Sequence, residues 1–213
     1  MLIYVWVHRP SMDLARESLI ELLEADGVLT DEDVAAAMRT IARDAYFDDV
    51  SKPFAYTLQD VTISDHVIAL NPRAIAEILS IARPHDEMNV LLLGTSTGYV
   101  EAILTAIGCT VTVIEPNEEQ RAYAQANLAR NGVRASYIAL EDARTYDLVI
   151  SLKTLLKLDP RVLGYTPYGR TVLVIGDEHT LIALDYRGDP TQPDVSYSGS
   201  VWLPFFDPPL LDE

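Results

Sequence analysis

Residues 89–115 (NVLLLGTSTGYVEAILTAIGCTVTVIE) constrain the fold of this chain more than any other stretch. A continuous apolar run stops at Gly94, and Gly98 follows one tight turn later. Apolar residues then recur at helical spacing as far as Ile107, and a β-branched run ends on Glu115. The stretch therefore predicts a buried strand, a glycine turn, a helix and a second strand that carries an acid at its tip.

Such a unit offers a ligand two kinds of contact. The backbone N–H groups of the turn and the positive end of the helix attract polar or negative groups. The carboxylate of Glu115, at the tip of the neighbouring strand, can accept hydrogen bonds from a ribose diol. We therefore expect half of a nucleoside-binding site here.

Helix and strand patterns alternate along the chain after residue 88, whereas helices and one long irregular loop precede it. Helices are expected over 12–27, 31–41, 71–82, 117–130 and 154–163, and strands over 89–93, 110–114, 135–140, 147–152, 171–175, 179–186 and 196–203. This order predicts an α/β fold: a doubly wound, Rossmann-like, mainly parallel sheet with right-handed crossovers and an antiparallel C-terminal edge hairpin. A helical N-terminal segment precedes it. Residues 1–87 would form a helical and loop lid region on the domain 88–213, in one compact unit.

The charge balance narrows the classes of partner. The chain has 32 acidic and 16 basic residues, a net charge of −16, and lysine only at 52, 153 and 157. Such a field repels phosphates, so no nucleic acid partner is expected. Two explanations stay open: an ordinary solvated surface, or a salt-rich cytoplasm.

Other compositional features also point to the cytoplasm. No apolar run is long enough to span a membrane. The apolar opening, 1–10, is expected to be an extra strand or a leader. A single cysteine, Cys109, excludes a disulfide framework, and four scattered histidines predict no metal site.

Several chemistries use a glycine turn of this kind. Read as G-x-S-x-G, it would be the nucleophile elbow of a hydrolase, with Ser96 as nucleophile and His179 as base. Candidates to orient that histidine are Asp147, Asp159 and Asp177. However, an elbow normally follows several strands, and it does not need an acid at the end of the next strand.

Three other interpretations of the turn stay open: a nicotinamide site, an S-adenosylmethionine site, and a turn that binds no ligand. A nicotinamide site typically has the pattern G-x-G-x-x-G. Here Ser96 replaces the middle glycine, and Val100 or Glu101 stands at the position of the third glycine. S-adenosylmethionine has no pyrophosphate, so a small residue at 96 suffices. Glu115 would hold its ribose, and the acids at 141–142, after the next strand, would lie near the adenine. Two acids at consecutive strand tips are unfavourable without a ligand that donates to them.

The order of motifs resembles the protein-L-isoaspartate O-methyltransferase family over nearly the whole chain. The segments that carry the likeness are 93–99 (LGTSTGY), 113–115 (VIE), 146–150 (YDLVI), 168–174 (YGRTVLV) and, in the N-terminal part, 30–46 and 54–56. The glycine motif alone would indicate only a general class I methyltransferase. The N-terminal likeness is more specific.

The resemblance implies S-adenosyl-L-methionine as cofactor and carboxyl methylation of isoaspartyl residues in damaged proteins, with a protein or peptide carboxylate as acceptor. Residues implied to wrap the methionine part and ribose are Gly94, Thr95, Ser96, Gly98 and Tyr99. Glu115 would take the ribose hydroxyls, and Asp142, with Glu141 beside it, the adenine.

The acceptor side departs from the family pattern. Where the family has G-Q-T-I-S-Q-P, this chain has 66–72 (HVIALNP), so Ile68 and Leu70 replace the threonine and serine. Residues expected to form the acceptor lip are Ser64, Asp65 and His66, and Thr62 with Ser64 would replace the lost hydroxyls after a loop rearrangement. Three outcomes stay open: isoaspartyl methylation, methylation of another acceptor, or a non-catalytic module that binds the cofactor or nothing.

Overall fold

A seven-stranded sheet forms the centre of the computed structural model, which describes residues 11–158, 160–186 and 193–206. The strands lie in the order β5-β4-β3-β6-β7-β8-β9. Their bounds are β3 (Asn89–Leu93), β4 (Thr110–Ile114), β5 (Ser136–Tyr137), β6 (Leu148–Leu155), β7 (Arg170–Ile175), β8 (Thr180–Asp185) and β9 (Asp194–Ser200). Strands β3 to β7 pair in parallel, and β7, β8 and β9 pair antiparallel. The predicted fold class is confirmed.

The helices begin where their capping residues predict. Asp31 accepts from the Val34 N–H, Asn71 caps the helix that Pro72 opens, and Asn117 accepts from the Gln120 N–H. The helices are α1 (Met12–Ala25), α2 (Glu32–Thr40), α3 (Pro72–Ala82), α4 (Tyr99–Ile107), α5 (Glu118–Arg130) and α6 (Pro160–Leu163). Short 3-10 turns are η1 (Arg43–Tyr46), η2 (Lys52–Phe54) and η3 (Leu140–Asp142), and a small hairpin pairs β1 (Val61–Thr62) with β2 (Ile68–Ala69).

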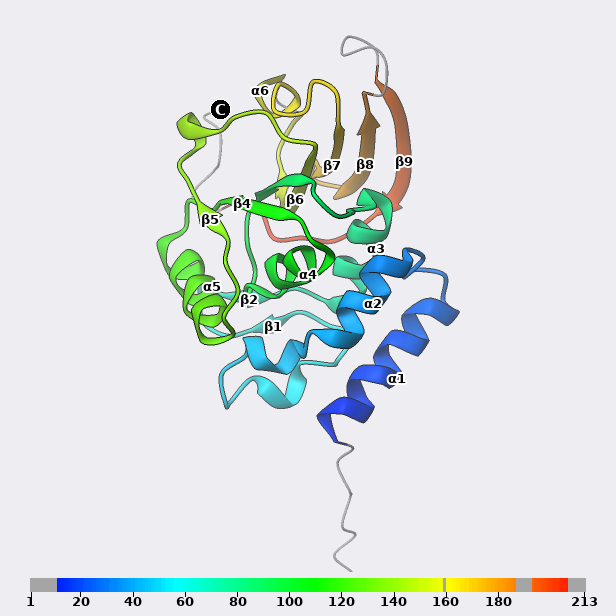
Figure 1. Ribbon diagram of the computed structural model, residues 1–213, viewed down its shortest axis with the longest axis vertical. Helices are drawn as coiled ribbons and strands as arrows, with labels where there is room; N and C mark the ends of the chain where they lie inside the picture. The colour runs from blue at the N-terminus through cyan, green and yellow to red at the C-terminus, as the bar shows by residue number, and fades with distance from the viewer. Residues whose placement is uncertain (1–10, 159, 187–192, 207–213) are drawn as a thin grey trace, which may run out of the picture.

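Both faces of the central strands β3, β6 and β7 are covered, as their unbroken apolar sequences require, whereas β9 at the edge is exposed. Val90 and Leu92 of β3 point into a core shared with α1, α2, α3 and α4. Leu91 and Leu93 point into a second core on the other face, where Val162 of α6 packs. Figure 1 shows α2 lying between α1 and α4 on the first of these faces. The helical N-terminal segment before β3, called the lead-in below, therefore shares one continuous core with the sheet.

Three expectations about the second half need correction. The helix predicted over 154–163 is wrong, because β6 continues to Leu155 and pairs with Val174 and Ile175 across an irregularity in register. Only Pro160–Leu163 is helical. The strand predicted over 135–140 is also too long: β5 is a two-residue edge strand, followed by the turn η3.

The last correction concerns the C-terminal hairpin, predicted over 179–186 and 196–203. Its second strand is Asp194–Ser200. The chain from 201 to 206 then leaves β8 and crosses to β6, where Thr154 N donates to Pro204 O at 2.9 Å. The expected opening strand, 1–10, and the candidate Asp159 lie outside the described residues.

Candidate functional site

The glycine turn lies at the carboxyl end of β3, between Gly94 and Gly98. Both have positive φ, 90° and 92°, a conformation that favours glycine. A side chain on Gly98 would also approach Ala124 O at 3.0 Å and Leu128 Cγ at 3.1 Å, because α5 packs directly on the turn. Gly98 is thus needed both for the shape of the turn and for the close packing of the two helices.

Glu115, at the tip of β4, is bonded to this turn. Its Oε2 accepts from Thr95 N at 3.0 Å, and its Oε1 accepts from Asn117 N at 3.0 Å. The residue is only 3% exposed, and burial raises the pKa of its carboxyl, whereas the Lys153 ammonium and the two N–H groups oppose the rise. Each carboxylate oxygen has a second lone pair. The two backbone bonds therefore fix the orientation of an acid that can still accept from a ligand.

A cavity of about 470 Å³ opens beside Glu115. Ile114, Pro116 and Leu140 line it with apolar groups, and Glu115 and Glu141 contribute carboxylates. Apolar walls with a few polar groups suit a flat, partly polar ligand such as adenosine. The structure thus brings Glu115 and Glu141 to one cavity, while the exposed Asp142 is not among its lining residues.

The side chain of Ser96 faces the N-terminal segment. Its Oγ accepts from Leu70 N at 3.0 Å and donates to Ile68 O at 3.0 Å, and the residue is buried. Gln120 of α5 completes this connection, since its Nε2 donates to Ser96 O and its Oε1 accepts from Ile68 N. Ser96 can therefore reach a cofactor only through its backbone.

Tyr99 is likewise turned toward the lead-in. Its ring lies 5.8 Å from that of Tyr46, and the Arg43 guanidinium lies 5.2 Å from its centre. Burial raises the pKa of the Tyr99 hydroxyl, so it is neutral and enclosed in the core. Tyr99 helps to pack η1 against α4, and its ring is turned to this core and is not among the residues that line the cavity beside Glu115.

Arg43 holds the segment that would face the acceptor. Its Nε donates to Ala55 O at 2.7 Å and its Nη2 to Leu70 O at 2.5 Å. Burial lowers its pKa to about 10, so it stays a cation at neutral pH. Both backbone groups of Leu70 are thereby occupied, and its side chain offers no hydrogen bond. Arg43 lies in the 30–46 segment that resembles the family, but no pattern in the sequence indicated its contacts or marked Gln120, because their partners lie far along the chain.

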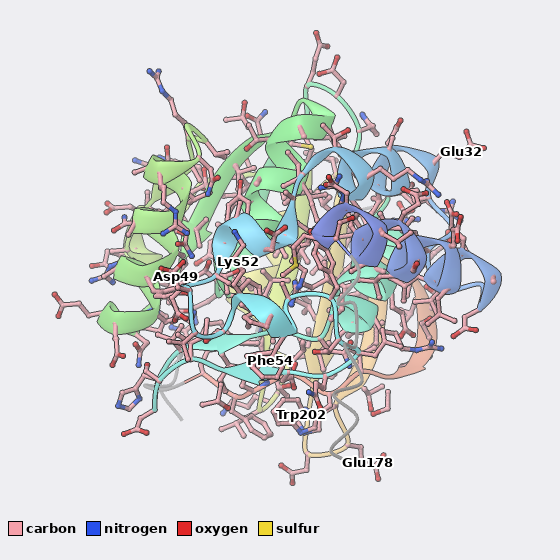
Figure 2. All side chains as sticks on the ribbon, turned by 90° about the horizontal axis from the view of Figure 1, so that it is seen from below. Glu32, Asp49, Lys52, Phe54, Glu178 and Trp202 are labelled. Atoms are coloured by element: carbon pink, nitrogen blue, oxygen red, sulfur yellow. The ribbon has the colours of Figure 1, made fainter. Side chains whose placement is uncertain are left out.

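The predicted acceptor lip lies at the bend between β1 and β2. Ser64 Oγ donates to Glu119 Oε1 of α5 at 2.5 Å, and Asp65 and His66 are exposed. On the face that carries this hairpin, Figure 2 shows Phe54 and Trp202 pointing outward, 49% and 54% exposed. An acceptor chain that approached over this face would meet aromatic groups as well as the lip.

The hydrolase reading does not fit the structure. Ser96 is bonded to the backbone of the 68–70 segment, whereas His179 Nδ1 lies 2.8 Å from Thr154 Oγ1 and its ring packs on Trp202 and Phe205. Serine and histidine are therefore engaged separately. Within 11–158, 160–186 and 193–206, no group of three His, Cys, Asp or Glu side chains could hold a metal, and no helix is long and apolar enough to cross a membrane.

The two ends of the candidate site differ in how well they fit an S-adenosyl ligand. The end beside Glu115 has a cavity and acceptors for an adenosine. At the other end, a side chain on Gly94 would meet Lys153 Cγ at 2.5 Å and Phe206 Cζ at 3.5 Å. The methionine arm of the cofactor would run along this turn, where Lys153 and Phe206 now occupy the space beside Gly94.

Comparisons with known proteins identify the family of this chain. The family model "Protein-L-isoaspartate(D-aspartate) O-methyltransferase (PCMT)" matches residues 14–146. A protein-L-isoaspartate O-methyltransferase from Pyrococcus abyssi is 29% identical over 75% of this chain and 78% of its own. A protein-L-isoaspartate O-methyltransferase from Pyrococcus horikoshii is 26% identical over 87% of this chain and 90% of its own.

Solved structures show the same fold. A structure from Plasmodium falciparum, described as a protein-L-isoaspartate O-methyltransferase in complex with S-adenosyl-L-homocysteine, superposes with a TM-score of 0.74 at 15% identity. It covers 90% of this chain and 97% of its own. With the match to the family model extending over more than half of the sequence, the chain belongs to the protein-L-isoaspartate(D-aspartate) O-methyltransferase family.

Proposed function

We propose that this protein is a methyltransferase that uses S-adenosyl-L-methionine as donor and a carboxyl group of a protein or peptide as acceptor, with isoaspartyl residues as the first candidate. One observation carries the proposal. The turn amide of Thr95 orients the Glu115 carboxylate, and Glu115 shares a cavity with Glu141 that suits an adenosine. The single, buried cysteine and the chemistry of the relatives fit a cytoplasmic repair enzyme.

A carboxylate acceptor suits this site because little acid–base chemistry is required. A carboxylate is already ionised at neutral pH, so methyl transfer to it depends mainly on positioning. Ile68 and Leu70, at the positions where hydroxyls were expected, offer no side-chain hydrogen bond, and their backbone groups are already bonded, so that task falls to the lip at 64–66. An acceptor other than an isoaspartyl peptide is therefore the second candidate, and the altered residues are the observation that favours it.

The adenosine site is tested by calorimetry with S-adenosylhomocysteine on the wild type and on Glu115→Ala. Loss of charge-assisted hydrogen bonds to the ribose should weaken binding by roughly 1.5–3 kcal/mol. Thr97→Val is the matched control: the Thr97 hydroxyl lies on the same turn and has no hydrogen-bond partner within the described part of the chain, so this variant should bind as the wild type does. An unchanged affinity in Glu115→Ala would place the site elsewhere.

The acceptor is tested by formation of base-labile methyl esters on two peptides that differ only in an isoaspartyl or an ordinary aspartyl residue. We expect esters on the isoaspartyl peptide alone. The assay should be run in dilute buffer and at high salt, because a chain of net charge −16 repels an acidic peptide until salt screens the repulsion. Ligand binding without ester on either peptide would favour the second acceptor class.

A further inference from the structure

Lys153 lies where β6 extends beyond its neighbour β3. The last pairing between these two strands joins Leu93 to Ser151, so Lys153 stands past the end of β3, over the first glycine of the turn. The residue is 7% exposed, and its Cβ and Cγ lie against Gly94. The lysine stem therefore covers the turn that a donor would have to contact.

The C-terminal segment holds Lys153 in this position. Thr154, the next residue along β6, donates from N to Pro204 O and from Oγ1 to Leu203 O, both at 2.9 Å. These bonds bring Phe206, which is buried, to the same side of Gly94 as the lysine stem. The cover over the turn thus consists of one residue from β6 and one from the 201–206 segment that β6 anchors.

Lys153 brings a positive charge to the site as well as its volume. Its ammonium acts on Glu115 and counters the rise in the pKa of that carboxyl that burial causes. S-adenosylmethionine carries a positive sulfonium, and S-adenosylhomocysteine carries an uncharged thioether in its place. Two cations in a buried site repel each other more strongly than in water, because the effective dielectric constant is lower and salt screens buried charges poorly.

We propose that Lys153 is a specificity-determining residue of the donor site: it covers the glycine turn in the free protein, keeps out the methionine arm until its side chain turns away, and disfavours a sulfonium relative to a thioether. This inference rests on the proposed function, because it concerns the same site. It predicts that the free protein binds 5′-methylthioadenosine, which lacks the amino-acid arm, and binds S-adenosylhomocysteine more tightly than S-adenosylmethionine.

The test measures the affinity of all three ligands for the wild type, Lys153→Met and Lys153→Ala by calorimetry. Lys153→Met keeps most of the stem and removes the charge, so S-adenosylmethionine should bind about tenfold more tightly and S-adenosylhomocysteine should change less. Lys153→Ala also uncovers the turn, so both ligands that carry the amino-acid arm should gain. Lys157→Met, which removes an exposed lysine four residues away, should change nothing.

The outcomes separate this inference from the proposed function. If the wild type binds S-adenosylmethionine and neither Lys153 variant binds it more tightly, Lys153 has no such role and the proposed function stands. If only the Lys153 variants bind, the inference is supported. If thermal unfolding shows every variant folded and none binds any of the ligands, both are overturned, since removal of the cover should have opened the site.

Discussion

Replacement of Ser96 by alanine tests whether this side chain connects the glycine turn to the N-terminal segment. The substitution removes the acceptor of Leu70 N and the donor to Ile68 O, both at 3.0 Å. Leu70 is buried, so its N–H would be left without a partner, and an unsatisfied buried donor costs about 1–3 kcal/mol. Because the hydrogen bond to Ile68 O is lost as well, we expect the free energy of unfolding to fall by about 2–3 kcal/mol.

The assay is urea unfolding at a fixed salt concentration, followed by circular dichroism, with thermal unfolding as a second measurement. For a chain of this size, each 1 kcal/mol corresponds to roughly 2–4 °C in Tm, so Ser96→Ala should unfold about 4–12 °C lower than the wild type.

The neighbouring Thr97 supplies the control. Among the residues that the structure describes, its Oγ1 is buried without a hydrogen-bond partner. Thr97→Val, which keeps the shape and removes the hydroxyl, should therefore be neutral or stabilising. A loss below about 0.5 kcal/mol for Ser96→Ala, the range of ordinary surface substitutions, would refute the connecting role. Equal losses for the two variants would show that any change in this turn is harmful.

Further predictions concern the turn and the core beneath it. Gly94→Ala places a Cβ 2.5 Å from Lys153 Cγ at a φ of 90°, so urea unfolding should show a loss of roughly 1–3 kcal/mol. Asn127→Ala removes an amide that donates to main-chain carbonyls of η1 and of the turn, both at 2.9 Å, and should cost about 1–3 kcal/mol in the same assay. Glu101 is fully buried, and burial raises the pKa of its carboxyl above 4.5 in the folded state. The folded form therefore resists ionisation, and the wild type should lose stability relative to Glu101→Gln as the pH rises from 4.5 through the folded-state pKa. If the difference between the urea midpoints of the wild type and Glu101→Gln stays constant from pH 4 to pH 8, the raised pKa of Glu101 is contradicted.

Local patterns in the sequence were enough to predict the strands, helix and glycine turn that form the centre of the candidate site. Unbroken apolar runs, capping residues and glycines at both ends of the turn specify β3, α4 and β4 without knowledge of the rest of the fold. The acid at the tip of β4 follows from the same register, so Glu115 was found where expected. These features depend on neighbours within a few residues, which a sequence shows directly.

What could not be predicted depends on contacts between distant segments. The orientation of Ser96 is set by backbone groups near residue 70, and that of Arg43 by carbonyls 12 and 27 residues away. Lys153 was expected to lie between a strand that ends at residue 152 and a helix that begins at 154. Only the pairing of β6 with β7 and the returning C-terminal segment place it over Gly94. The residues that distinguish this site from a generic donor site are the ones that tertiary packing determines.

A crystal structure of the protein with bound S-adenosylhomocysteine tests the central claim most directly. It should show the ribose hydroxyls on Glu115, the adenine in the cavity beside Glu141, and the Lys153 side chain turned away from Gly94. A ligand bound elsewhere, or one bound at the turn with Lys153 unmoved, would contradict this account of the site.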